Sequence, residues 1–209
     1  MNQYHKKIDD LMVQHIHIIE QLRKREIHNI EKIIKIIVNA ISKDHTLFIF
    51  GNGGSAADAQ HIAGEFVNKL KIDRRPLPAI ALTTDTSIIT AIANDSGYRH
   101  VFERQIAALG KKGDVALAIT TSDFTSDGHS IILKDALMKA KEKEMITIGF
   151  VSDKSKNILS LLDEQVVIPD KETPRIQETQ ILVAHIICEL VEEEFYKEKI
   201  EVIINNNVK

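Results

Sequence analysis

Apolar residues in the first 42 positions recur at intervals of three and four. This spacing places them on one face of an α-helix, and no glycine or proline interrupts the segment. We therefore predict one or two amphipathic helices, with a break near Arg25–Asn29. A small domain rarely needs so long a leading arm to complete its own core. Residues 1–42 are accordingly expected to form an oligomerisation arm that packs against another subunit.

The pattern changes from residue 46 onward, where short apolar runs alternate with longer stretches of helical periodicity. The runs predicted as buried strands are TLFIF (46–50), PAIAL (78–82), DVALAI (114–119), ITIGFV (146–151) and EQVVIP (164–169). The stretches predicted as helices are 55–70, 86–94, 99–109, 130–143, 155–162 and 174–198.

Strands that alternate with helices in this way predict an α/β fold. Its parallel five-stranded sheet should be covered by helices on both faces. No shift in composition marks a second domain, so we expect a single domain over residues 1–209, with the sheet and helix core at 46–198.

The composition narrows the classes of function. Hydrophobic residues make up 44% and charged residues 27% of the 209 residues, which is typical of a globular protein. The formal net charge of -3 gives no general attraction to nucleic acid, and no apolar run reaches the ~20 residues of a membrane span. Cys188 is the single cysteine, so no intramolecular disulfide can form. This favours a cytoplasmic protein, and the apolar surroundings of Cys188 favour a buried thiol.

A glycine-rich turn, GNGGS (51–55), joins the first predicted strand to a helix. Glycines let backbone N–H groups approach an anion, the helix N-terminus adds unpaired donors, and Ser55 can cap the helix. The turn is no Walker loop, but residues 51–56 satisfy the loose dinucleotide pattern G-x-G-x-x-A. Asp73 has the spacing of the acidic residue in that pattern, yet its surroundings do not read as a strand. A phosphate-sugar site, a dinucleotide site and a purely structural turn all remain open.

Two pairs of polar residues lie near helical apolar stripes. His61 and Glu65 are four residues apart and share one helix face, where they form either a solvated pair or a pair for metal binding or proton transfer. Gln177 and His185 are eight residues apart on the last predicted helix. A buried histidine is usually a satisfied core residue, so this second pair matters only if the fold brings it to the glycine-rich turn.

Four stretches together resemble the phosphoheptose isomerase family of the sugar isomerase (SIS) superfamily. They are GNGGSAADAQHIAGEF (51–66), RRPLPAIALTTDTSIITAIANDSGY (74–98), VFERQIAALGKKGDVALAI (101–119) and RIQETQILVAHI (175–186). The resemblance implies a flavodoxin-like fold and a homotetramer with active sites at subunit interfaces. It implies conversion of a small sugar phosphate, D-sedoheptulose 7-phosphate, to D-glycero-D-manno-heptose 7-phosphate. This step begins the synthesis of heptose for lipopolysaccharide or other glycoconjugates.

The resemblance also implies roles for individual residues. Glu65 and His185 would form the proton-transfer pair, and Zn2+ would be held by His61, Glu65, Gln177 and His185. The residues implied in substrate binding are Asn52, Gly53, Gly54, Ser55, Asp95, Thr120, Thr121, Ser122, Ser130 and Gln177.

One loop departs from the family pattern. The phosphate loop of the family usually reads S-T-S-G-N-S, whereas this chain has TTSDFTSDGHS (120–130). The simplest alignment inserts DFTSD at 123–127, and an alternative places Ser126 on the phosphate. The insertion is either a surface expansion or a change of specificity toward another phosphorylated or nucleotide-linked sugar. In the second case Asp123, Asp127 or His129 would touch the substrate or gate the site.

Two other functions compete with the isomerase. A non-catalytic SIS protein that binds the DnaA replication initiator keeps the sheet, much of the glycine-rich turn and the RIQE motif. It lacks the glutamate and histidine that stand here at Glu65 and His185, so the sequence favours chemistry over partner binding. A sugar-phosphate-sensing regulator usually carries an appended domain, and no such segment is visible in this sequence.

Overall fold

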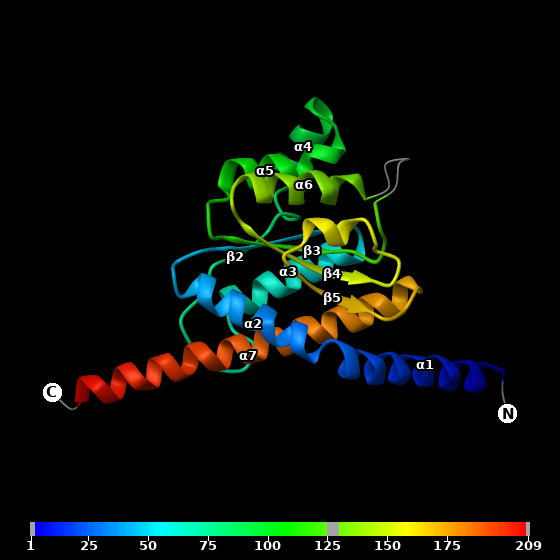
Figure 1. The fold of residues 1–209 in the computed structure, drawn as a ribbon, viewed down its shortest axis with the longest axis horizontal. Coiled ribbons are helices and arrows are strands. Elements are labelled where there is room, and N and C mark those ends of the chain that lie inside the picture. Colours follow the sequence, from blue (N-terminus) through cyan, green and yellow to red (C-terminus); the bar gives the residue numbers. More distant parts are fainter. Residues whose placement is uncertain (1–2, 125–129, 208–209) are drawn as a thin grey trace.

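A computed structural model describes residues 3–124 and 130–207, with side chains as far as residue 197 in the last helix. Five parallel strands form one sheet in the order β2-β1-β3-β4-β5 (Figure 1). The strands are β1 (Leu47–Gly51), β2 (Ala79–Ala81), β3 (Val115–Ile119), β4 (Ile146–Ser152) and β5 (Glu164–Ile168). This order is that of flavodoxin-like folds, so the predicted fold class is confirmed.

Helices cover both faces of the sheet (Figure 1). One core cluster packs under α2, α3 and α7, and the other packs under α5 and α6. The central strands β1 and β3 are buried along their whole length, which explains why they are uninterrupted apolar runs. The helices are α1 (Gln3–Arg25), α2 (Ile27–Ile41), α3 (Gly54–Val67), α4 (Thr86–Asp95), η1 (Tyr98–His100), α5 (Val101–Leu109), α6 (Ile131–Glu142), η2 (Ile158–Leu161) and α7 (Thr173–Asn207).

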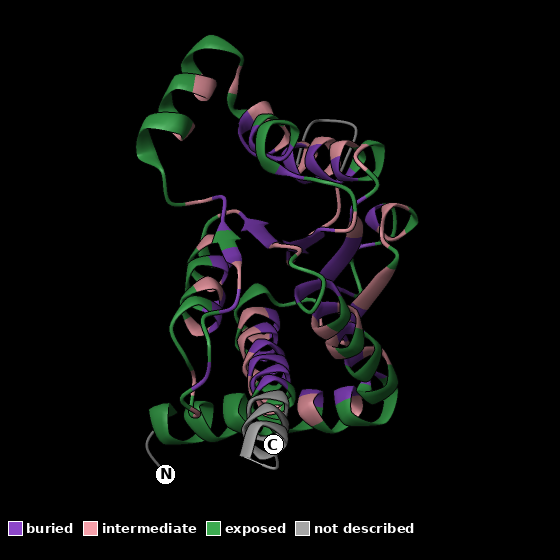
Figure 2. Ribbon diagram, turned by 90° about the vertical axis from the view of Figure 1, so that its left-hand side faces the viewer, coloured by how far each residue is buried: buried purple, intermediate pink, exposed green. Residues whose placement is uncertain are grey.

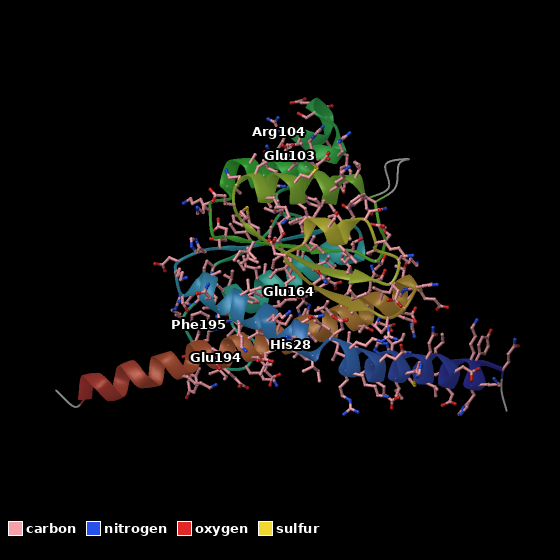
Figure 3. The ribbon with its side chains drawn as sticks, viewed as in Figure 1. His28, Glu103, Arg104, Glu164, Glu194 and Phe195 are labelled. Atoms are coloured by element: carbon pink, nitrogen blue, oxygen red, sulfur yellow. The ribbon has the colours of Figure 1, made fainter. Side chains whose placement is uncertain are left out.

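The leading arm breaks at Glu26, within the predicted interval. The buried Glu26 carboxylate accepts hydrogen bonds from Asn29 Nδ2 at 2.9 Å and from the backbone N–H of Val167 at 3.3 Å, which ties the break to β5. Lys32 Nζ on α2 lies 3.3 Å from Glu164 Oε2 at the start of the same strand (Glu164 is labelled in Figure 3). The arm is therefore anchored to the domain at its break and along α2.

The two outlying helices expose apolar side chains. Only Ile18 and Leu22 of α1 are buried, and the helix extends away from the sheet (Figure 1). No residue of α4 is buried, and this helix projects from the body of the molecule (Figure 2). Among the described helices, none is long and apolar enough to cross a membrane.

The predicted helix at 155–162 is wrong, because this segment holds only the short 3-10 helix η2. The backbone N–H groups of residues 156–158 bind the Asp123 carboxylate instead of starting an α-helix. The last helix was predicted to end at 198, but α7 continues to Asn207. The remaining predicted helices and strands agree with the structure to within a few residues.

Candidate active site

A cavity of 460 Å³ opens at the carboxyl ends of β1 and β3. These strands are neighbours, with Gly51 paired to Ile119, so the segments that follow them meet at one edge of the sheet. Nine of the residues predicted to bind substrate line the cavity: Asn52, Gly53, Gly54, Ser55, Thr120, Thr121, Ser122, Ser130 and Gln177.

The first wall of the cavity is the glycine-rich turn. Gly53 precedes α3 with φ of 58°, a conformation that glycine adopts without strain. Gly51 lets the turn pack tightly, because a Cβ there would lie 2.7 Å from the Ile119 carbonyl oxygen and 2.7 Å from Ser55 Cβ. The N-terminus of α3 has no side-chain cap, and its Ser55 and Ala56 N–H groups bond to the carbonyl oxygens of Asn52 and Gly53 within the turn. The positive end of the helix dipole favours an anion at this wall.

The second wall is a turn closed by hydroxyl groups. Thr120 Oγ1 donates to the Ser122 carbonyl oxygen at 2.9 Å and accepts from the Ser122 N–H at 3.1 Å. The hydroxyls of Ser122 and Ser130 lie 3.1 Å apart. Ser130 has φ of 56° at the start of α6. Two hydroxyls so close together can both donate to one phosphate group.

The inserted stretch begins beside this wall. Asp123 does not line the cavity, because its carboxylate accepts hydrogen bonds from the N–H groups of Lys156 at 2.9 Å, Asn157 at 2.7 Å and Ile158 at 3.1 Å. Phe124 packs on the core below α6. The Asp123 charge is therefore directed away from a bound anion. Ser126, Asp127 and His129 lie outside the described residues.

Three further polar residues line the cavity and were missed in the sequence: Tyr98, Arg99 and Thr173. The Tyr98 hydroxyl donates to Asn52 Oδ1 at 3.2 Å. Arg99 is the one charged side chain among the lining residues, and its Nε donates to Asp135 Oδ2 at 2.8 Å. Tyr98 and Arg99 stand in the short stretch G-Y-R after α4, and nothing in its spacing links it to the cavity.

Asp95, the tenth predicted substrate contact, is not among the residues that line the cavity. It ends the projecting helix α4, and its carboxylate accepts a hydrogen bond from Asn94 Nδ2 at 2.7 Å. Its role in substrate binding stays a prediction.

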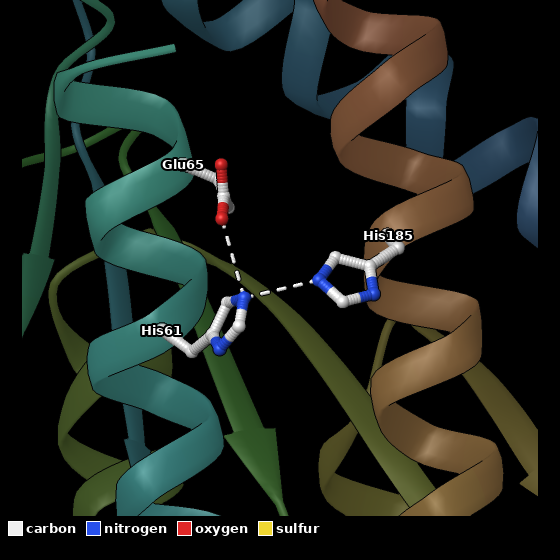
Figure 4. Close-up of side chains that lie close together, drawn as sticks. All are labelled: His61, Glu65 and His185. Carbon is white, nitrogen blue, oxygen red and sulfur yellow. Dashed lines mark hydrogen bonds and ion pairs between the residues drawn. The ribbon is translucent and has the colours of Figure 1, made fainter. Parts of the chain in front are cut away.

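His61, Glu65 and His185 form a cluster between the neighbouring helices α3 and α7 (Figure 4). His61 Nε2 lies 3.2 Å from Glu65 Oε1 and 3.0 Å from His185 Nε2. The Glu65 side chain is 21% exposed, so the cluster is open to solvent and to a ligand. The fold thus places His185 of the last helix beside α3, the helix that begins at the glycine-rich turn. The predicted role of His185 requires this proximity.

The cluster has the geometry of a site for a divalent metal. The three candidate ligand atoms all lie within 4.8 Å of one another. Zinc–nitrogen bonds of about 2.0–2.1 Å in a tetrahedral site place neighbouring ligand atoms roughly 3.3 Å apart. Moreover, two imidazole nitrogens that face each other at 3.0 Å need a proton or a cation between them. Two imidazoles and a carboxylate also leave a fourth position open, as catalytic zinc sites do.

Asp58 and Cys188 complete the surroundings of the cluster. Burial raises the pKa of the Asp58 carboxyl, and the nearby His61 acts in the opposite direction. Asp58 Oδ2 is buried and has no hydrogen-bond partner within the described part of the chain. Burial raises the pKa of the Cys188 thiol to about 12, so this predicted buried cysteine is unreactive.

Gln177 lies at the cavity end of the two helices. A Cβ on Gly54 would collide with the Gln177 side-chain amide, so α3 and α7 approach closely there. Gly54 and His61 are seven residues, or about two turns, apart on α3, so the cavity and the cluster lie along one face of this helix, separated by about 10 Å of helix rise. Gln177 as a fourth metal ligand stays a prediction.

Comparison with known proteins agrees with this fold. A model of the SIS domain matches residues 12–152. The phosphoheptose isomerase of Clostridium acetobutylicum is 44% identical over 175 residues, which cover 84% of this chain and 87% of the relative. The solved phosphoheptose isomerase of Neisseria gonorrhoeae is 33% identical with a TM-score of 0.83, and the match covers 91% of this chain and all of that chain. The one from Francisella tularensis is 28% identical with a TM-score of 0.86 over 91% of this chain and 99% of that chain.

Both the family model and these relatives cover most of the chain, and the relatives carry the name of an isomerase rather than that of a binding protein. The chain belongs to the SIS domain family and, within it, to the phosphoheptose isomerases, which are sugar-phosphate isomerases.

Proposed function

We propose that this enzyme converts D-sedoheptulose 7-phosphate to D-glycero-D-manno-heptose 7-phosphate through an enediol. The observation that carries the proposal is the meeting of His61, Glu65 and His185 on two helices that also border a cavity lined by the predicted phosphate contacts. The identity of 44% to a phosphoheptose isomerase supports the choice of substrate.

The phosphate would bind between the two walls of the cavity. The N-terminal end of α3, where the helix dipole is positive, would face the phosphate from one side, and the hydroxyls of Ser122 and Ser130 would face it from the other. Arg99 also lines the cavity, and its ion pair with Asp135 offsets part of the positive charge that favours a phosphate dianion. An extended sugar chain would then run along α3, over the about 10 Å of helix rise that separates Gly54 from His61. Its carbonyl end would reach the cluster.

The reaction moves one proton from C1 to C2 and another from the C1 oxygen to the C2 oxygen. Breaking the C1–H bond of the ketose moves its electron pair into a C1=C2 bond while the C2 oxygen gains a proton. The enediol then loses the proton on the C1 oxygen, and C2 gains a proton to give the aldose. Glu65 and His185 would share the carbon-bound and oxygen-bound protons, one residue each. One Glu65 oxygen faces His61 and the other points away from both imidazoles, so it remains free to act (Figure 4).

We propose Zn2+ as the metal of this site, with His61, Glu65 and His185 as ligands. Gln177, whose side-chain amide lies beside Gly54 at the cavity end of the two helices, stays a prediction as a fourth ligand. When bound, such an ion polarises the substrate carbonyl and stabilises the enediolate. His61 would serve mainly as a ligand, because its Nε2 lies between the other two groups.

The insertion after Ser122 supports the surface-expansion interpretation. A carboxylate that binds three backbone N–H groups away from the cavity adds no repulsion to a bound phosphate. Specificity for another phosphorylated sugar is less favoured for this reason. The partner-binding alternative is also not favoured, because the chain keeps Glu65 and His185.

The apolar residues that α1 leaves exposed support a homotetramer with sites at subunit interfaces. Several of them are more than half exposed: Tyr4, Ile8, Met12, Val13 and Ile16. A buried free thiol at Cys188 fits a reducing compartment, so we assign the enzyme to the cytoplasm and its product to heptose synthesis for lipopolysaccharide or a related glycoconjugate.

The test is to incubate the purified protein with sedoheptulose 7-phosphate and to follow the aldose by NMR, with chelator and with added zinc. Turnover that chelator removes and zinc restores is expected. Fructose 6-phosphate and ribulose 5-phosphate serve as competing substrates. Faster turnover of either, or no turnover of the heptulose under any condition, would contradict the assignment.

A further inference from the structure

A buried ion pair lies under the catalytic cluster and has no part in the chemistry described so far. Arg74 follows α3 in the chain, and Glu192 lies on α7. Their side chains are 2% and 1% exposed, and Arg74 Nε lies 3.4 Å from Glu192 Oε1. Such a pair is costly to bury, and it adds little stability over apolar residues of the same size. Stability alone therefore does not explain a buried ion pair at this position.

The Arg74 guanidinium binds the C-terminal end of α3. Its Nη2 donates to the carbonyl oxygen of Glu65 at 2.7 Å, and its Nη1 donates to those of Phe66 at 2.8 Å and Asn68 at 3.1 Å. These are carbonyl groups that a helix end leaves without partners. One of them belongs to the backbone of the proposed proton-transfer residue. Arg74 thus fixes the main chain at Glu65.

The Glu192 carboxylate holds the loop that leads to Arg74. It accepts hydrogen bonds from the N–H groups of Leu70 at 2.9 Å, Lys71 at 2.7 Å and Ile72 at 2.9 Å. Burial acts to raise the pKa of Glu192, but these N–H groups and Arg74 outweigh it and lower the pKa. The carboxylate is ionised at neutral pH and binds three successive backbone N–H groups of this loop.

Glu192 also shares a helix face with the cluster. It follows His185 by seven residues, which is two turns of helix. The helices α3 and α7 therefore meet at three levels: Gly54 with Gln177, His61 with His185, and the Glu65 backbone with Glu192 through Arg74. Apolar packing between helices tolerates small sliding movements, whereas the bonds of a buried ion pair have fixed directions.

We propose that Arg74 and Glu192 are positioning residues that set the distance between Glu65 and His185. The inference rests on the proposed function, because it concerns the geometry of that same proton-transfer pair. The pair acts through the backbone of Glu65 and through the register of α7, and neither residue touches substrate. A misplacement of about 1 Å at a catalytic group can cost about 100-fold in rate. A disturbance of the Arg74–Glu192 pair, called the clamp below, should therefore lower the rate.

The decisive variant is Arg74→Lys. Lysine keeps the charge opposite Glu192 and leaves its bonds to the loop, but a single ammonium cannot span the carbonyls that the guanidinium joins. Lys71→Gln is the matched control, because the exposed pair between Lys71 and Glu189 (Nζ–Oε1 2.6 Å) joins the same loop to the same helix without touching α3. Glu192→Gln is the second variant, in which one backbone N–H loses its acceptor.

For Arg74→Lys and Glu192→Gln we expect kcat per folded subunit to fall by about 10- to 100-fold. KM and competitive inhibition by inorganic phosphate should stay within about twofold, because the cavity walls are untouched. Lys71→Gln should match the wild type in all three. A kcat within about twofold of wild type in the folded Arg74→Lys protein would overturn the inference, and so would an equal loss in Lys71→Gln.

A second readout separates this inference from the proposed function. Imidazole 15N chemical shifts of His61 and His185, measured after chelator treatment, report the 3.0 Å contact between their Nε2 atoms without any turnover. Arg74→Lys should shift both resonances toward those of isolated imidazoles, and Lys71→Gln should not. Unchanged shifts in Arg74→Lys refute the positioning role. A wild-type protein with no heptulose turnover refutes the proposed function while leaving this measurement to test the clamp.

Discussion

Replacing Asp123 with alanine removes the anchor of the inserted loop. Its carboxylate holds the N–H groups of Lys156, Asn157 and Ile158, and it follows directly after Ser122 in the cavity wall. Asp123→Ala therefore frees the segment next to the phosphate donors. The substitution leaves every hydroxyl of the cavity in place.

The size of the effect follows from the bonds that are lost. The carboxylate acts as a cap for exposed backbone donors, and such caps contribute about 0.5–2 kcal/mol because water replaces part of the lost bonding. At the upper end, a chain of this length should lose roughly 4–8 °C in Tm, since each kcal/mol shifts Tm by about 2–4 °C. If Ser122 loses half of a charge-assisted hydrogen bond of about 3 kcal/mol to the phosphate, KM rises about tenfold while kcat is unchanged.

The assay is steady-state turnover of sedoheptulose 7-phosphate, with Tm measured at the same protein concentration. Asp163→Ala is the control, because the Asp163 carboxylate likewise accepts the N–H of Thr147, at 2.8 Å, but at the opposite edge of the sheet. It should lower Tm without changing KM. If Asp123→Ala lowers Tm by the same amount and leaves KM unchanged, the loop anchor has no part in substrate binding and the reasoning is refuted.

Three further predictions concern the site and its supports. Glu65→Gln and His185→Gln should each lose at least about 100-fold in kcat with the oligomer intact by sedimentation, and near-normal turnover in either would exclude it from the proton transfers. Gly51→Ala should lose about 1–3 kcal/mol of stability, because the new Cβ would lie 2.7 Å from a backbone carbonyl oxygen. Gly54→Ala displaces only the flexible side-chain amide of Gln177, so it should raise KM at an unchanged Tm. Equal melting curves for the two variants would contradict this difference in stability. Burial raises the pKa of Cys188 from 9.0 to about 12, so the stability that the neutral thiol contributes is complete below pH 9 and is lost as the pH rises toward 12. Between pH 9 and 12 the free energy of unfolding should fall with pH by about 1.4 kcal/mol per pH unit more in the wild type than in Cys188→Ala. Parallel curves for the two proteins would show that the pKa of the thiol is not raised.

Local patterns were sufficient for most of the fold. Apolar runs predicted all five strands, and the central strands β1 and β3 are fully buried apolar runs because a parallel sheet covered on both faces leaves them no position for polar alternation. The segment at 155–162 misled the prediction, since its backbone donors are taken by Asp123 from more than thirty residues away. Periodicity cannot report such a distant partner.

Local patterns and the family resemblance predicted part of the site. The helical spacing of His61 and Glu65 indicates that they share a helix face, and the resemblance to the family predicts the serines and threonines of the cavity. Arg99 and Arg74 were missed because their roles depend on tertiary contacts with Asp135 and with the end of α3. A sequence shows a residue's type and its near neighbours but not which helix end it will reach.

The central claim is that Glu65 and His185 move a carbon-bound proton through an enediol. Its most direct test is to run the wild-type reaction in D2O and to measure deuterium at C2 of the aldose by NMR. Because the Glu65 side chain is 21% exposed, a proton held there exchanges with solvent, and the account predicts label at C2 that depends on Glu65 and His185. Aldose formed at full rate with no deuterium at C2 would indicate a direct hydride shift and would contradict the account.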